Sequence, residues 1–126
     1  MRLLASYVVG FVALVQVVIC VAEMFFWKCE CVYGRLQDVF HFTEAEVANV
    51  EPIVKNVGLY NGFIAAGLVW SVWAKTDSRS LKFFFLSCVA LAGIYGAATM
   101  KPATLVLQTL PALAALCLVG MANKTT

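Results

Sequence analysis

Charge is scarce in this sequence. Only 13% of the 126 residues are Asp, Glu, Lys or Arg, and the formal net charge is +2. A soluble domain of this size carries about a quarter charged residues, so the composition excludes an ordinary soluble domain. The small net charge and the lack of a basic arm also exclude nucleic acid as a partner.

Residues that bind metals or perform common hydrolytic chemistry are scarce too. His41 is the only histidine, and Cys29 and Cys31 form a Cys-x-Cys pair that supplies too few ligands for zinc. We therefore expect no metal and no cofactor, and the cysteine pair is either inert or redox-sensitive. No Ser–His pairing and no glycine-rich phosphate loop occurs in the sequence, which excludes most hydrolases and nucleotide-binding enzymes.

Long uncharged runs make up most of the chain instead. They cover residues 3–22, 56–74, 83–100 and 102–123, and contain 20, 19, 18 and 22 residues. An apolar stretch of about 18 residues is long enough to cross the ~30 Å hydrocarbon core as a helix. Because backbone groups in lipid must pair internally, helices are expected. The sequence predicts an all-α membrane protein, a four-transmembrane-helix bundle that forms one domain over residues 1–126.

The expected membrane helices cover about residues 3–27, 53–74, 81–100 and 102–122. The loop over 28–52 contains a capping-box pattern at Thr43 and Glu46, which predicts a short interfacial helix over about 44–50. Pro52 fits the first turn of the second membrane helix. Trp27 is expected to anchor the end of the first helix at the membrane interface, and Pro111 to kink the fourth helix.

Lysine and arginine predict the orientation of the bundle. The short turn over 75–82 is strongly basic, whereas the loop over 28–52 is rich in Asp and Glu. This places both termini in the cytoplasm of a multi-pass protein of the plasma or inner membrane. The count of basic residues, five on one side and four on the other, leaves dual insertion open. The first run also has features of a signal peptide, but it is longer than a usual signal core.

The polar side chains of the predicted helices gather near their outer ends. Glu23 is the candidate catalytic or proton-exchanging acid. Candidate ligand-binding residues are Asn56, Tyr60, Asn61, Tyr95, Thr99, Gln108 and, two turns deeper than Glu23, Gln16. Apart from Gln16, these positions fall within about 10 Å of the outer boundary at the helical rise per residue. The sequence therefore predicts a polar pocket in the outer half of the bundle, centred on Glu23.

Structural alternatives exist for the same residues. Glu23 is close enough to the boundary to reach water, or to pair with Lys28 or Lys55. The amides of Asn56, Asn61 and Gln108 are as compatible with joining helices as with binding a ligand. Small-residue stripes, formed by Gly58, Gly62 and Ala66 and by Gly93 and Ala97, indicate close helix packing.

Four blocks of the sequence carry a resemblance to a known family. They are EMFxW at 23–27, NxGLYNGFxAAG at 56–67, AGIYGAAT at 92–99 and QxLPA at 108–112. The chain resembles the small integral membrane proteins catalogued as domain of unknown function 1304. The resemblance covers nearly the whole chain and implies a four-helix membrane fold, but no activity. The loop around Cys29, Cys31 and His41 departs from the family pattern.

Three functions are compatible with these features. The first is binding or transport of a small lipophilic or cationic ligand, for which a homo-oligomer is expected because one bundle is small for a translocation path. The second is a membrane enzyme that uses Glu23 for proton transfer, as an isomerase, cyclase or cofactor-free oxygenase. The third is a structural or accessory membrane subunit.

Overall fold

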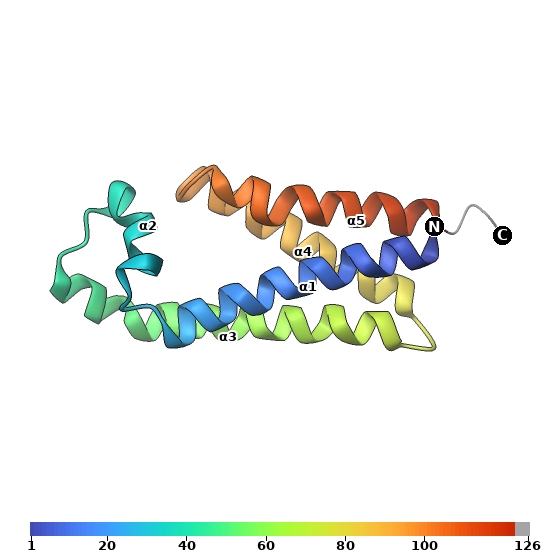
Figure 1. Ribbon diagram of the computed structural model, residues 1–126, viewed down its shortest axis with the longest axis horizontal. Helices are drawn as coiled ribbons and strands as arrows, with labels where there is room; N and C mark the ends of the chain where they lie inside the picture. The colour runs from blue at the N-terminus through green and yellow to red at the C-terminus, as the bar shows by residue number, and fades with distance from the viewer. Residues whose placement is uncertain (123–126) are drawn as a thin grey trace.

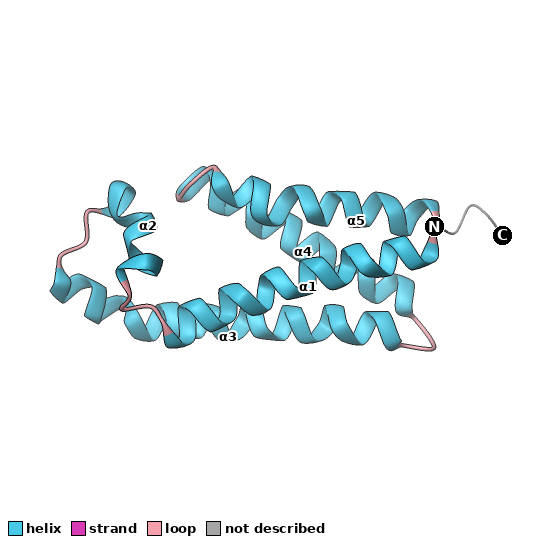
Figure 2. Ribbon diagram, viewed as in Figure 1, coloured by secondary structure: helices cyan, strands magenta, loops and turns pink. Residues whose placement is uncertain are grey.

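The protein consists of helices joined by short connections. A computed structural model describes residues 1–122, apart from the side chains of Arg35 and Asp38, so the tail with Lys124 lies outside the described residues. The elements are α1 (Arg2–Phe25), α2 (Glu30–Phe40), α3 (Glu44–Trp73), α4 (Ser78–Thr99), the π-helical segment η1 (Leu105–Thr109) and α5 (Leu110–Met121). Residues 1–122 contain no strand (Figure 2). The prediction of an all-α fold with about four long helices is confirmed.

The long helices form an antiparallel bundle. Helix α1 packs against α3 and α5, and α4 packs against α3 and α5. The N-terminus, the α3–α4 turn and the end of α5 lie together at one end, here called the terminal end (Figure 1). Helix α2 lies at the opposite end, here called the α2 end (Figure 1).

The core of the bundle is built from small and medium apolar residues. Its buried members are Ala5, Val9, Val12, Ala13, Leu68, Leu86, Val89, Ala90, Ala112, Ala115 and Val119. On α1 these residues recur at helical spacing, so one face of the helix is buried and the opposite face is free. Small side chains let helix backbones approach closely, as in membrane bundles.

Helix α3 corrects the expectation of a separate interfacial helix over 44–50. The capping box at Thr43 is present, because the Glu46 N–H donates to Thr43 Oγ1 at 3.3 Å and the Thr43 N–H donates to Glu46 Oε2 at 2.8 Å. The helix then continues through Pro52 to Trp73. Proline removes one backbone donor, and both Pro52 and Ala48, four residues earlier, are exposed. Water at this surface position can satisfy the freed carbonyl, so the helix is not interrupted.

The region over 28–52 is more ordered than a loop. It contains α2, which ends at His41 in the left-handed conformation with φ 49°. Trp27 was expected at the membrane interface, but the residue is only 4% exposed. Its Nε1–H donates to the Val47 carbonyl at 2.9 Å, and its ring has edge contacts with Tyr33 and Phe42. Trp27 therefore joins α2 to the start of α3.

The last of the long helical stretches has a local irregularity where Pro111 was expected to kink it. The π-helical segment η1 lies directly before α5, and Pro111 lies in the first turn of α5. Since proline has no N–H, it cannot donate to the carbonyl four residues earlier, and the wider turn accommodates that loss. Thr109 thereby faces α4, where its hydroxyl donates to the Ala90 carbonyl at 3.3 Å.

Two helices, α1 and α4, are long and apolar enough to cross a membrane, with mean hydropathy values of 2.5 and 1.7 in their most apolar windows. The apolar stretch Leu105–Met121 is shorter. In α1 only 28% of the apolar window is buried, and in α4 only 22%. Both helices thus present most of their apolar surface outward.

Candidate functional site

Glu23 is held by a residue of the neighbouring helix. The side-chain amide of Asn61 on α3 donates a 2.9 Å hydrogen bond to Glu23 Oε2 on α1. The two backbones are close here because Gly58 has no side chain. A Cβ at Gly58 would lie 2.9 Å from Glu23 Cβ and 2.9 Å from Met24 Cγ. The small-residue stripe of α3 therefore places Asn61 within reach of the carboxyl group.

The alternative in which Glu23 pairs with a lysine is not observed. Lys28 and Lys55 both bind Glu51, with N–O distances of 2.9 and 2.8 Å. Hydrogen bonds from Lys55 and then Lys28 lower the pKa of the Glu51 carboxyl, which lies outside the predicted membrane spans. The two lysines are thus engaged at the α2 end, and Glu23 has the neutral Asn61 amide as its partner.

Gln16 lies on the same face of α1 as Glu23, two turns closer to the middle of the helix. Gln16 as a whole residue is only 2% exposed, and its amide has no hydrogen-bond partner among the described residues, but its polar atoms are not fully buried. Gln16 lines a pocket of about 300 Å³ between α1, α3 and α4. The Gln16 pocket also includes Tyr60, Asn61, Phe63, Ile64, Cys88, Val89 and Ala92. Its polar lining is small and includes one amide from each of two helices.

The position of the Gln16 pocket differs from the predicted outer location. Gln16 lies nine residues before the end of α1, which is about 13 Å along a helix. Val89 likewise lies near the middle of α4. Tyr60 and Phe63 are exposed and their rings meet edge to face, with centroids 5.8 Å apart. The pocket therefore opens at the surface beside these rings, at mid-height in the bundle.

The structure does not bring all the predicted site residues to this pocket. Asn56 is exposed on α3, and Tyr95 is 71% exposed on α4. The Thr99 hydroxyl donates to the Tyr95 carbonyl at 2.8 Å, which is a local contact within α4. Gln108 is half-buried in η1, where its Cβ lies beside Gly93. Of the predicted residues, Gln16, Tyr60 and Asn61 line the pocket, and Glu23 is joined to it by its hydrogen bond with Asn61.

Cys88 is a pocket residue that the sequence interpretation missed. It was interpreted as a small apolar residue within a membrane helix, and in the structure it lines the pocket together with Val89 and Ala92. Cys20 is similarly close to the site, since a Cβ at Gly62 would lie 3.0 Å from its sulfur. The sequence gives no signal that Cys20 and Cys88 lie near a site, because the runs 3–22 and 83–100 that contain them are apolar.

The chemistry available at the site is hydrogen bonding. Asn61 uses its amide N–H on Glu23, which leaves its carbonyl oxygen to accept a hydrogen bond. The free Gln16 amide can donate and accept. Glu23 is not among the residues that line the pocket, and it connects to the pocket through Asn61. Within residues 1–122 no group of three His, Cys, Asp or Glu residues is placed to hold a metal ion.

Comparison with known proteins identifies the family. The family model described as protein of unknown function (DUF1304) matches residues 10–120. The chain belongs to this family. Over 65 residues it is 29% identical to the uncharacterized protein YpaA of Lactococcus lactis subsp. lactis (strain IL1403), a match that covers 52% of this chain and 55% of the relative. The match thus spans about half the length of that relative, and no solved structure matches the chain.

Proposed function

We propose that the chain is an integral membrane protein whose four long helices cross the bilayer, with the terminal end in the cytoplasm. The outward face of α1 supports this arrangement, since Leu3, Phe11, Leu14 and Val18 are all more than half exposed. In water such a continuous apolar face would be unfavourable, whereas lipid solvates it. The basic residues of the terminal end fit the positive-inside rule.

We further propose that the Gln16 pocket binds a small lipophilic molecule that carries one polar group. The observation that carries this proposal is the Gln16 amide, which lines the pocket without a hydrogen-bond partner among the described residues. A ligand with a donor or acceptor would form a hydrogen bond with this amide, which contributes about 0.5–1.5 kcal/mol net. The volume of about 300 Å³ is at the lower end of the range of small-molecule sites.

The residues around the pocket define what the ligand should look like. Apolar side chains such as Ile64 and Val89 favour a hydrocarbon body. The free oxygen of Asn61 and the amide of Gln16 favour a hydroxyl or an amine on that body. Glu23 acts as a positioning residue, because its hydrogen bond with Asn61 orients the amide that lines the pocket.

Mass spectrometry of molecules that copurify with the full-length protein tests this proposal. We expect wild type to carry an adduct that Gln16→Leu and Asn61→Ala lose. Asn56→Ala is the matched control, because Asn56 lies on the same helix but is exposed outside the pocket. Glu23→Gln retains an acceptor for Asn61, so a neutral ligand should remain bound and a cationic one should be weakened.

The outcomes also separate the alternative functions. An adduct that is present equally in all variants, or in none, contradicts binding in the Gln16 pocket. Absence of any adduct together with an unfolding defect confined to Asn61→Ala would favour a role in helix assembly. Release of the adduct in a chemically altered form that depends on Glu23 would favour a membrane enzyme.

A further inference from the structure

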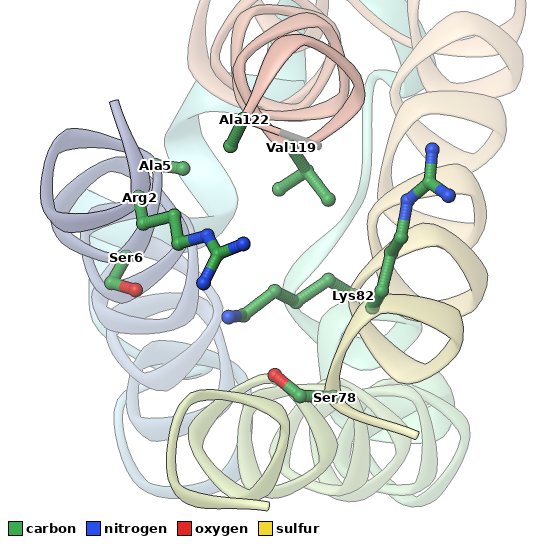
Figure 3. Close-up of a pocket in the computed structure, with 8 residues that line it drawn as sticks. Arg2, Ala5, Ser6, Ser78, Lys82, Val119 and Ala122 are labelled. Atoms are coloured by element: carbon green, nitrogen blue, oxygen red, sulfur yellow. The ribbon is translucent and has the colours of Figure 1, made fainter. Parts of the chain in front are cut away.

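A second pocket lies at the terminal end of the bundle. It is formed by the first turns of α1 and α4 and the end of α5, and its volume is about 410 Å³ (Figure 3). Three basic residues, Arg2, Arg79 and Lys82, line it together with Ser6 and Ser78. The remaining wall is apolar and consists of Ala5, Val119 and Ala122. We call it the basic pocket.

The positive charge of the basic pocket has no partner in the described part of the chain. None of its lining residues is acidic. Asp77 precedes α4 at the same end, but it is exposed and does not line the pocket. The ion pairs between described side chains join Lys28 and Lys55 to Glu51, at the α2 end. Among residues 1–122, the pocket is therefore a site of uncompensated positive charge.

Two of the cations face each other. The Arg2 guanidinium from α1 and the Lys82 ammonium from α4 extend toward one another across the pocket (Figure 3). Like charges at close range repel, and an anion between them would convert that repulsion into two attractive contacts. The Arg79 guanidinium lies over the Phe83 ring, 5.3 Å from its centroid, which holds the third cation beside the site.

We propose that the basic pocket binds a phosphate group, and that a phospholipid headgroup is the form that supplies it. The planar donors of arginine and the ammonium of lysine match phosphate oxygens. Ser6 can donate a further hydrogen bond, whereas the Ser78 hydroxyl already donates to the Ser71 carbonyl at 2.6 Å. The apolar wall suits the glycerol and first acyl carbons of a lipid. A free phosphate ion would leave this wall uncovered.

This proposal is independent of ligand binding in the Gln16 pocket. The two pockets share no lining residue and lie at different heights of the bundle. Failure of one proposal therefore leaves the other unaffected.

Binding assays on the full-length protein in an uncharged detergent test the basic pocket. The probes are dioctanoyl phosphatidylglycerol, dioctanoylglycerol, which lacks the phosphate, and inorganic phosphate. We expect phosphatidylglycerol to bind wild type saturably, and Lys82→Gln to weaken it by about tenfold or more, as for loss of a charged hydrogen bond. Arg2→Gln, at the exposed start of α1, repeats the test if Lys82→Gln does not fold.

Lys75→Gln is the matched control. It removes one positive charge from the same end of the molecule, but Lys75 is exposed and does not line the pocket. The affinity of the Lys75→Gln variant for dioctanoyl phosphatidylglycerol should stay close to that of wild type. Displacement of the lipid by equimolar inorganic phosphate would support the phosphate site and assign it to the free ion. Equal weakening by Lys82→Gln and Lys75→Gln, or equal binding of dioctanoylglycerol, would overturn the proposal.

Discussion

Asn61 and Glu23 join α3 to α1 through a 2.9 Å hydrogen bond, one helical turn from the point where Gly58 brings the two backbones together. The same amide lines the Gln16 pocket. A single side chain thus connects the packing of the two helices to the proposed ligand site. Changes at Asn61 are therefore expected to affect both stability and binding.

Replacement of Asn61 by alanine should destabilise the bundle by about 1 kcal/mol, the usual size of a hydrogen bond between side chains of two packed helices. Reversible unfolding in mixed micelles measures this loss. Asn56→Ala, at an exposed position of the same helix, is the control and should be nearly neutral. A double-mutant cycle with Glu23→Ala should show coupling, and strictly additive effects would mean that the hydrogen bond contributes nothing.

Replacement of Gly58 by alanine should separate α1 from α3. The new Cβ would lie 2.9 Å from two side-chain atoms and 3.2 Å from the Cys20 carbonyl, and the backbone atom cannot move aside easily. Overpacking of this kind costs roughly 1–3 kcal/mol. Gly10→Ala is the control, because a Cβ there meets nothing within 4 Å. Equal unfolding midpoints for the two variants would contradict the observed α1–α3 contact.

Replacement of Trp27 by phenylalanine should loosen the α2 end. The variant keeps most of the ring but loses the donor to the Val47 carbonyl, at a cost of about 1 kcal/mol. Limited proteolysis within residues 28–43 should become faster, while the long helices α1, α3, α4 and α5 stay protected. Trp73→Phe is the control, since Trp73 is 78% exposed. An unchanged cleavage pattern for Trp27→Phe would show that the anchor is dispensable.

The stability of the first turn of α3 should depend on pH through the Glu46 carboxyl. Hydrogen bonds from the Thr43 backbone N–H and hydroxyl lower the pKa of the Glu46 carboxyl. A lowered folded-state pKa means that the stabilisation is complete above the ordinary carboxyl pKa and is lost as the pH falls through the lowered value. Amide hydrogen exchange at residues 44–47, corrected for intrinsic rates, should show protection decreasing in that acidic range.

Two substitutions test the assignment of this pH dependence. Glu46→Gln should remove the titration, because the side chain can no longer gain a proton. Glu44→Gln removes a charge from the same helical turn but leaves the capping box intact, so the titration should persist. If both variants show the same pH dependence of amide protection as wild type, a group other than Glu46 causes the pH dependence of the first turn of α3.

The helical architecture could be predicted from the sequence because it depends on local properties. The uncharged runs, the capping box at Thr43 and the polar 75–82 segment can each be recognised within one continuous stretch of the sequence. The continuation of α3 through Pro52 could not be predicted, since it depends on whether the freed carbonyl meets water. The burial of Trp27 likewise depends on Val47, Tyr33 and Phe42, which approach it only after α2 and α3 have packed.

By itself, the sequence determined which residues could form the site: a few amides, phenols and one acid in otherwise apolar helices. Only the tertiary structure decided which of them meet. The rotation of each helix brought Gln16 and Asn61 to one pocket and left Asn56 and Tyr95 exposed. The close contact of Gly58 with α1 shows that this placement depends on how the helices fit together, which the sequence of any one helix does not contain.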